Sequence, residues 1–181
     1  MTETVLRWEW RSFGSHFDRA EGVLNALGAI GEPQASDELY LVGPEGSNLK
    51  IRSELLDLKN LLEQGQDGLQ LWAPTLKAGF PIDAEQVSAV FDAWGRESPI
   101  LERPSYTQQQ FIDELIMPLS GVSMVKVHKS RVRYAPDGCI AELTDLSADD
   151  WATRTVAVES ADRAAITSAI RELGLSSHEN A

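Results

Sequence analysis

The chain has 181 residues, of which 43% are hydrophobic and 24% charged, and its formal net charge is −12. This length suits one domain with a single core. The negative charge argues against sequence-independent binding to nucleic acid or to an anionic membrane, because both need a basic surface. No apolar run is long enough to span a bilayer and the first residues do not read as a signal peptide, so we expect a cytoplasmic protein.

The first half of the chain reads mainly as strands. Residues 5–11 alternate charged and large apolar side chains, which is typical of a strand with two different faces. Residues 15–27 follow as an amphipathic helix with a polar, capping start and a stop near Gly28. Four further strands are predicted, the first two as a hairpin around a turn at 43–48: 38–42, 49–52, 55–58 and 68–77.

Two predicted helices occupy the middle of the chain. The apolar residues of 82–94 recur at spacings of three and four, and Gly95 follows as a stop signal. The helix at 107–115 opens with Thr107 and Gln110 in a capping-box arrangement. The remaining elements are strands at 124–134, 139–146 and 153–159 and a helix at 162–173.

Together these elements predict an α+β fold built on a large antiparallel sheet or a closed barrel. We expect one domain over residues 1–175 and a flexible tail over 176–181. The lone Cys139 excludes an internal disulfide and is expected to be a small buried residue of a strand.

Basic side chains share one face of several predicted strands. In the first strand Arg7, Glu9 and Arg11 share a face, and the tryptophans of the opposite face should be covered by a helix. The same alternation holds for Lys50, Arg52, Lys59, Lys129, Arg131 and Arg133. An ordinary solvated sheet face is the alternative, but such a face in a chain with 28 acidic residues should carry mostly acids. Converging bases favour a bound phosphate-rich anion instead.

Six short motifs occur in an order that resembles the CYTH superfamily, which is named after a class of adenylyl cyclases and thiamine triphosphatase. The motifs are Arg7-x-Glu9-x-Arg11, Leu49-Lys50-Ile51-Arg52, Leu56-Asp57-Leu58-Lys59, Val127-His128-Lys129-Ser130-Arg131, Ala141-Glu142-Leu143-Thr144 and Thr155-Val156-Ala157-Val158-Glu159. The resemblance covers nearly the whole chain, from about Val5 to Gly174. It implies a closed or nearly closed antiparallel β-barrel, a tunnel of about eight strands with helices packed outside it.

The resemblance also implies a site inside the tunnel, where bases bind a triphosphate and carboxylates hold magnesium or manganese. The positions that match phosphate-binding bases are Arg11, Lys50, Arg52, Lys59, Lys129 and Arg131. Arg7 and Arg133 join them because they share the same strand faces. The positions that match metal-site carboxylates are Glu9, Glu142 and Glu159.

Two departures from the family pattern leave the function open. Arg7 stands where the family's first strand has a glutamate, and Ala157 replaces one carboxylate of the last pair. One hypothesis is a phosphohydrolase that cuts a triphosphate or polyphosphate with one divalent ion, and Arg7 would then supply part of the missing positive charge. A second is a binding or sensing module that has lost the metal site. A third is an unrelated structural α+β protein. The oligomeric state is not indicated by the sequence.

Overall fold

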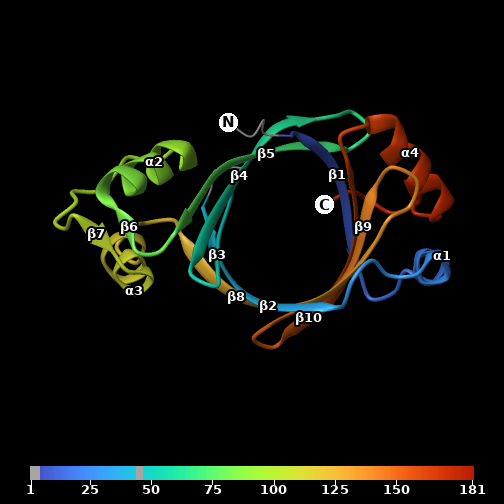
Figure 1. Cartoon of the computed structure of the whole chain (residues 1–181), viewed down its shortest axis with the longest axis horizontal. Coiled ribbons are helices and arrows are strands. Elements are labelled where there is room, and N and C mark those ends of the chain that lie inside the picture. The colour runs from blue at the N-terminus through green and yellow to red at the C-terminus, as the bar shows by residue number, and fades with distance from the viewer. Residues whose placement is uncertain (1–4, 44–46) are drawn as a thin grey trace. The chain divides into compact units, whose positions relative to one another are not determined.

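The computed structural model describes residues 5–43 and 47–181 (Figure 1). Eight strands form a closed antiparallel barrel in the order β1-β10-β9-β8-β2-β3-β4-β5. They are β1 (Arg7–Gly14), β2 (Gln34–Val42), β3 (Ser47–Arg52), β4 (Leu55–Gln64), β5 (Gln70–Gly79), β8 (Ser123–Tyr134), β9 (Ile140–Ala148) and β10 (Trp151–Ser160). The predicted α+β fold and its barrel of about eight strands are confirmed. Residues 44–46 of the predicted turn lie outside the described residues.

The helices and a small two-stranded sheet complete the fold. The helices are α1 (Asp18–Leu27), α2 (Ala84–Trp94), α3 (Gln108–Gln110), the π-helix η1 (Phe111–Ile116) and α4 (Arg163–Glu172). The strands β6 (Ile82–Asp83) and β7 (Ser105–Tyr106) pair with each other. In the described part of the chain, no helix combines the length and apolarity needed to cross a membrane.

The chain divides into two compact units, which are described separately. The first unit comprises Met1–Ser36, Leu61–Ala73 and Val127–Ala181, and the second comprises Asp37–Asn60 and Pro74–Lys126.

The core of the first unit lies between its strands and the helices α1 and α4, which Figure 1 shows beside β1 and β9. Trp10 of β1 is 3% exposed and joins Leu24 of α1, Val158 of β10 and Ile166 of α4 in one hydrophobic cluster. Burying such side chains is the main favourable term in folding. The prediction that a helix covers the tryptophan face of the first strand is therefore confirmed.

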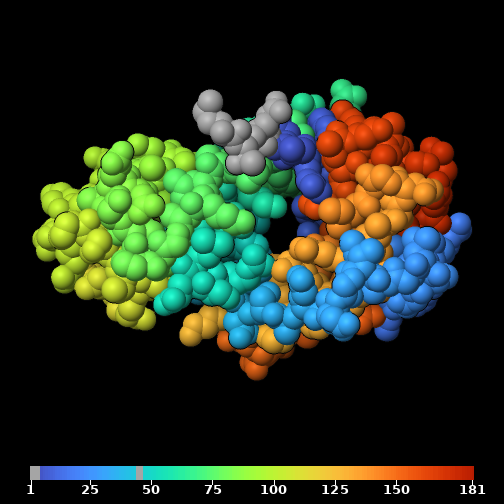
Figure 2. Space-filling view, in the orientation of Figure 1, coloured from blue at the N-terminus to red at the C-terminus, as the bar shows by residue number. Residues whose placement is uncertain are grey.

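The core of the second unit lies between β3, β4 and the α2–η1 region. Leu49, Ile51 and Leu58 are buried against Phe91 of α2 and Phe111 of η1. Figure 2 shows the residues of α2, α3 and the segment between them packed into one continuous body. The strand faces opposite this core carry the charged residues.

The ends of the helices show which of the predicted capping interactions are present. α2 has a complete capping box between Asp83 and Gln86, and Gly95 ends it in the left-handed conformation with φ of 79°. The capping box predicted for Thr107 and Gln110 is also present. The polar cap expected for the helix at 15–27 is wrong, because α1 begins after Phe17 and has no side-chain cap. Phe17 takes this position because its ring is buried in the core of the first unit.

Residues 176–181, predicted to be a flexible tail, make several contacts within the first unit. The Asn180 Oδ1 atom accepts a hydrogen bond from the Arg11 backbone N–H at 2.6 Å, and the Ala181 N–H donates to the Arg11 carbonyl at 2.8 Å. The ring centroids of His178 and Phe17 are 5.3 Å apart. These residues therefore lie beside β1 at Arg11.

Candidate functional site

In the first unit, the strands β1, β10, β9 and β8 have one face packed on the core and the other face directed away from it. Trp10, Val158, Ala141 and Tyr134 are register partners in one row across these strands, and all four belong to the hydrophobic core. Side chains alternate along a strand, so the residues between them lie on the opposite face, which points into the barrel. We call this the inner face of the first unit. It carries Arg7, Glu9, Arg11, Lys129, Arg131, Arg133, Glu142, Thr144, Thr155 and Glu159.

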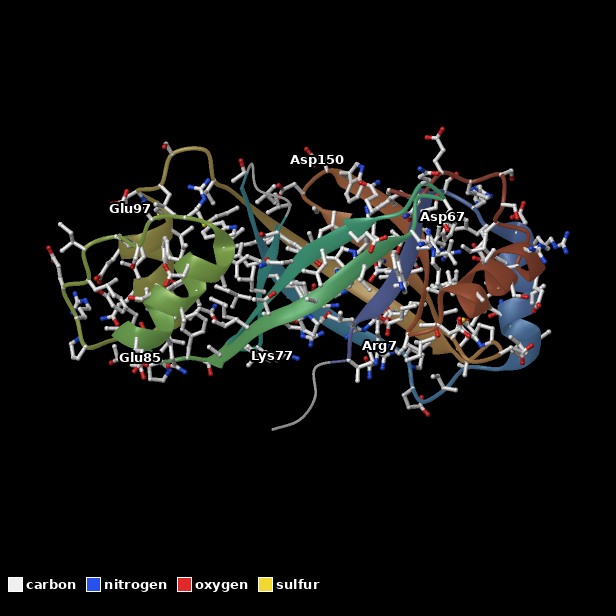
Figure 3. All side chains as sticks on the ribbon, turned by 90° about the horizontal axis from the view of Figure 1, so that it is seen from above. Arg7, Asp67, Lys77, Glu85, Glu97 and Asp150 are labelled. Carbon is white, nitrogen blue, oxygen red and sulfur yellow. The ribbon has the colours of Figure 1, made fainter. Side chains whose placement is uncertain are left out.

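Two arginines of β1 bind the two carboxylates at the β1–β10 ladder. Glu9 and Glu159 are direct register partners, an arrangement in which like charges repel. The Arg7 Nη1 atom lies 3.2 Å from Glu159 Oε1, and Arg11 Nε lies 2.9 Å from Glu9 Oε1. Arg11 Nη1 also donates to the Thr155 hydroxyl at 3.1 Å. Each carboxylate is thus neutralised by its own arginine. Figure 3 labels Arg7 at the start of β1.

The β8–β9 ladder contributes a third ion pair and an unusual polar pair beside it. Arg133 Nε donates to Glu142 Oε1 at 2.9 Å, and the two residues are register partners. The next inner-face pair along the ladder is Arg131 and Thr144. The Arg131 Nε and Thr144 Oγ1 atoms are both buried, and neither has a hydrogen-bond partner among the described residues. Buried polar atoms are nearly always hydrogen-bonded in proteins, so this pair requires a partner.

The second unit has its own row of charged residues. Lys50 and Arg52 alternate with the core residues of β3, and Lys59 does the same on β4. Tyr40 of β2, Lys50 of β3 and Asp57 of β4 are successive register partners. We call the face with these residues the inner face of the second unit.

Glu38 of β2 lies at the centre of this second group. Its side chain is fully buried, and it accepts hydrogen bonds from the Tyr40 hydroxyl at 2.8 Å, Lys50 Nζ at 3.2 Å and Arg52 Nη1 at 3.5 Å. Burying a carboxylate is costly unless hydrogen bonds and opposite charges compensate it. Lys50 and Arg52 therefore already have one anionic partner inside the protein.

The surroundings of Lys50 affect its protonation. Burial is the largest effect and lowers the pKa of Lys50 below its usual 10.5, while Glu38 and Asp57 act in the opposite direction. Desolvation disfavours the charged form of an amine, and nearby carboxylates favour it. Glu38 and Asp57 therefore favour the charged form of Lys50, against the effect of burial.

The structure adds two residues to the set predicted from the sequence. Glu38 shares a strand face with Tyr40, opposite Leu41 of the core, and this alternation was the available signal. Lys77 of β5, labelled in Figure 3, is exposed and alternates with the core residue Ala78. Lys77 was the last residue of the strand predicted at 68–77. No alternation beyond it therefore indicated which face of the strand it occupies.

Two bases left out of the prediction lie on other faces. Arg154 forms ion pairs with Asp145 at 2.7 Å and with Glu21 of α1 at 2.9 Å. Lys126 of β8 is exposed, whereas the residues on either side of it in the strand are partly buried. Neither residue belongs to an inner face as defined above.

The carboxylates expected to hold a metal ion do not fit that role as they are arranged. No group of three histidine, cysteine or acidic side chains in the described residues could hold a metal ion. Glu9, Glu142 and Glu159 each bind an arginine at 2.9 to 3.2 Å instead. Divalent ions such as magnesium prefer carboxylate oxygens that are open to coordinate them. The donor set therefore suits an anion better than a cation.

Comparison with known proteins supports the fold. No protein-family model matches the chain, and no curated protein sequence matches it. A solved structure of a Pyrococcus horikoshii protein is 16% identical, with a TM-score of 0.58 over 93% of this chain and 90% of that one. A putative adenylate cyclase of Bacillus halodurans is 14% identical, with a TM-score of 0.55 over 98% of this chain and 92% of that one.

A third similar structure is a putative adenylyl cyclase from Hippeastrum that is described as having a dominant triphosphatase activity. It is 14% identical, with a TM-score of 0.51 over 93% of this chain and 88% of that one. Likeness at such low identity establishes the fold. The chain therefore has the tunnel-type barrel implied by its resemblance to the CYTH superfamily. Its sequence is divergent from those of the solved structures with this fold.

Proposed function

We propose that the chain binds a small phosphate-rich anion, such as a triphosphate or a short polyphosphate, on the inner face of the first unit. The observation that carries the proposal is the buried pair of Arg131 Nε and Thr144 Oγ1, which lack a hydrogen-bond partner among the described residues. Phosphate oxygens accept hydrogen bonds from both guanidinium and hydroxyl groups. A phosphate could satisfy both atoms once a local side-chain shift opens access to them, since both are buried.

The charge around this pair supports the same class of ligand. The inner face of the first unit carries five bases, Arg7, Arg11, Lys129, Arg131 and Arg133, against three carboxylates. An arginine has five N–H donors, and each ion pair described above uses one nitrogen of its arginine. Guanidinium groups can bind several phosphate oxygens at once, and the excess positive charge of this face favours a polyanion.

The inner face of the second unit carries bases of its own, and we include Lys50, Arg52 and Lys59 among the proposed phosphate-binding residues. Lys50 and Arg52 already bind Glu38, so their contribution is expected to be smaller than that of Arg131. Lys59 is the register partner of Asn48 and can donate hydrogen bonds through its ammonium group.

A binding or sensing role fits these residues better than hydrolysis. Metal-assisted phosphoryl transfer uses carboxylates to hold ions at the reacting phosphate. Here Glu9, Glu142 and Glu159, the residues proposed for such an ion, accept hydrogen bonds from arginines. The triphosphatase activity of the Hippeastrum protein makes hydrolysis the rival that an experiment must also detect.

The test is thermal unfolding of the purified chain with tripolyphosphate, ATP, pyrophosphate and sulfate at matched ionic strength, followed by measurement of released phosphate. Binding stabilises the native state by about 2.7 kcal/mol when the ligand is at one hundred times its Kd. We expect tripolyphosphate to raise the Tm more than sulfate does, with no phosphate released. Equal effects of all four anions would contradict a specific site, and phosphate release would favour the hydrolase.

A further inference from the structure

We infer that the inner face of the first unit holds its anion without a divalent metal ion, because arginines take the carboxylates that would otherwise bind one. The inference rests on the proposed function for its anion, but its central measurement is made with metal alone. It starts from three ion pairs, Arg7 with Glu159, Arg11 with Glu9, and Arg133 with Glu142.

The pairs at β1 and β10 form a compact group of alternating charges. Glu9 and Glu159 are register partners, so their backbones place two carboxylates side by side, as a metal site would require. Their oxygens nevertheless accept hydrogen bonds from Arg11 and Arg7. Arg7 is decisive, because it stands two residues before Glu9 on the same strand face and binds the opposite carboxylate.

Partial burial of the three carboxylates disfavours a hydrated ion, although Arg7 and Arg133 are themselves 44% and 40% exposed. The side chains of Glu142 and Glu9 are 17% and 20% exposed, and that of Glu159 is 28% exposed. A divalent ion at this place must lose much of its water and displace a guanidinium that stays tethered beside it. Magnesium gives up its water reluctantly.

The local charge acts in the same direction. With five bases against three carboxylates, the face is positive before any anion arrives. Coulomb repulsion of an ion is proportional to its charge, so a divalent cation is repelled twice as strongly as a monovalent one. The positive charge that metal ions bring to a bound polyphosphate is supplied here by arginine, as cationic clamps do in other phosphate sites.

The experiment measures Mn²⁺ binding by titration calorimetry for the natural chain and for two variants at one position. Arg7→Glu places a third carboxylate beside Glu9 and Glu159 and frees Glu159 from its arginine. Arg7→Gln is the matched control, because it removes the guanidinium without adding a carboxylate. Circular dichroism and thermal unfolding of both variants show that each is folded.

We expect no measurable Mn²⁺ binding by the natural chain and a gain of about tenfold or more in Mn²⁺ affinity for Arg7→Glu over Arg7→Gln. Metal binding by the natural chain that Glu9→Gln or Glu159→Gln abolishes would overturn the inference, and so would equal affinities of the two Arg7 variants. In a second arm, tripolyphosphate should stabilise the natural chain equally in EDTA and in magnesium. Stabilisation only with magnesium would overturn the inference, whereas no stabilisation in either condition would reject the proposed function and leave the Mn²⁺ result to decide the metal question.

Discussion

Glu38 and Lys50 are twelve positions apart in the chain, and the Lys50 ammonium lies 3.2 Å from the buried Glu38 carboxylate. Neighbouring strands bring them together, and Tyr40 and Arg52 complete the group around the carboxylate. This buried carboxylate favours the charged form of Lys50, whereas burial disfavours it. Its removal should therefore affect both stability and protonation.

Replacing Glu38 with alanine should destabilise the protein by roughly 3 kcal/mol, because Lys50 and Arg52 would lose their buried counter-ion. Glu38→Gln should cost less, since its amide oxygen still accepts hydrogen bonds. Urea unfolding of both variants measures the difference. If the two variants proved equally stable, the carboxylate group would not be acting through its hydrogen bonds.

The Lys50 side chain should give the stability a defined pH dependence. Its pKa in the folded state lies below 10.5, mainly because of burial, so between these two values the unfolded chain binds more protons. The contribution of Lys50 to stability is therefore largest above pH 10.5 and is lost as the pH falls through its folded pKa.

The measurement for Lys50 is urea unfolding across this pH range for the natural chain, Lys50→Met and Lys50→Arg. Both substitutions should remove the rise in stability with pH, because methionine does not titrate and arginine stays protonated. The arginine variant also controls for the loss of the positive charge. A variant that kept the natural slope would assign the titration to another residue.

Arg131 should matter for anion binding and little for stability. We expect Arg131→Met to weaken tripolyphosphate binding by about tenfold or more, the effect of losing charge-assisted hydrogen bonds. The same change should leave the free energy of unfolding unchanged or raise it, because the buried Nε atom has no partner to lose among the described residues. Calorimetry and urea unfolding measure the two effects.

Lys126→Met is the control for Arg131, since Lys126 lies on β8 but is exposed. It should change neither the affinity nor the stability by much. If Arg131→Met bound tripolyphosphate as tightly as Lys126→Met, Arg131 would not be part of an anion site.

Trp10 and Phe13 of β1 should differ strongly in their effect on stability. Trp10 is 3% exposed and lies in the core of the first unit, whereas Phe13 is 47% exposed. Trp10→Ala should cost about 3–5 kcal/mol, and Phe13→Ala should cost less than about 1 kcal/mol. Denaturant unfolding distinguishes them, and similar losses would mean that the strand faces are assigned wrongly.

The elements that the sequence predicted well are those with a strong local period. The alternation in 5–11 and in 124–134 was sufficient for β1 and β8, and capping residues located the start of α3. The beginning of β2 at 34–37 was missed, because these residues are mostly polar and show no clear alternation. The predicted helix at 107–115 continues as the π-helix η1, which its apolar spacing did not distinguish from an α-helix.

The faces of the candidate residues were predictable for the same reason, but their partners were not. Arg131 and Val132 must point to opposite sides of β8 whatever the rest of the fold does. That Arg7 binds Glu159, which is 152 positions away, depends on the register between β1 and β10. Register is set by the packing of the whole sheet and has no signal within a single strand.

Side-chain alternation is a property of each strand, so the amino-acid pattern alone predicts that bases gather on strand faces away from the core. Which of these charges are already neutralised depends on how the strands come together in the fold. The fold joined Arg7 to Glu159 and Glu38 to Lys50, and it left the Arg131 Nε and Thr144 hydroxyl buried without a described partner. These outcomes depend on contacts between side chains of different strands, at 3.2 Å for both ion pairs, where short-range hydrogen bonding and burial determine the partner of each charge.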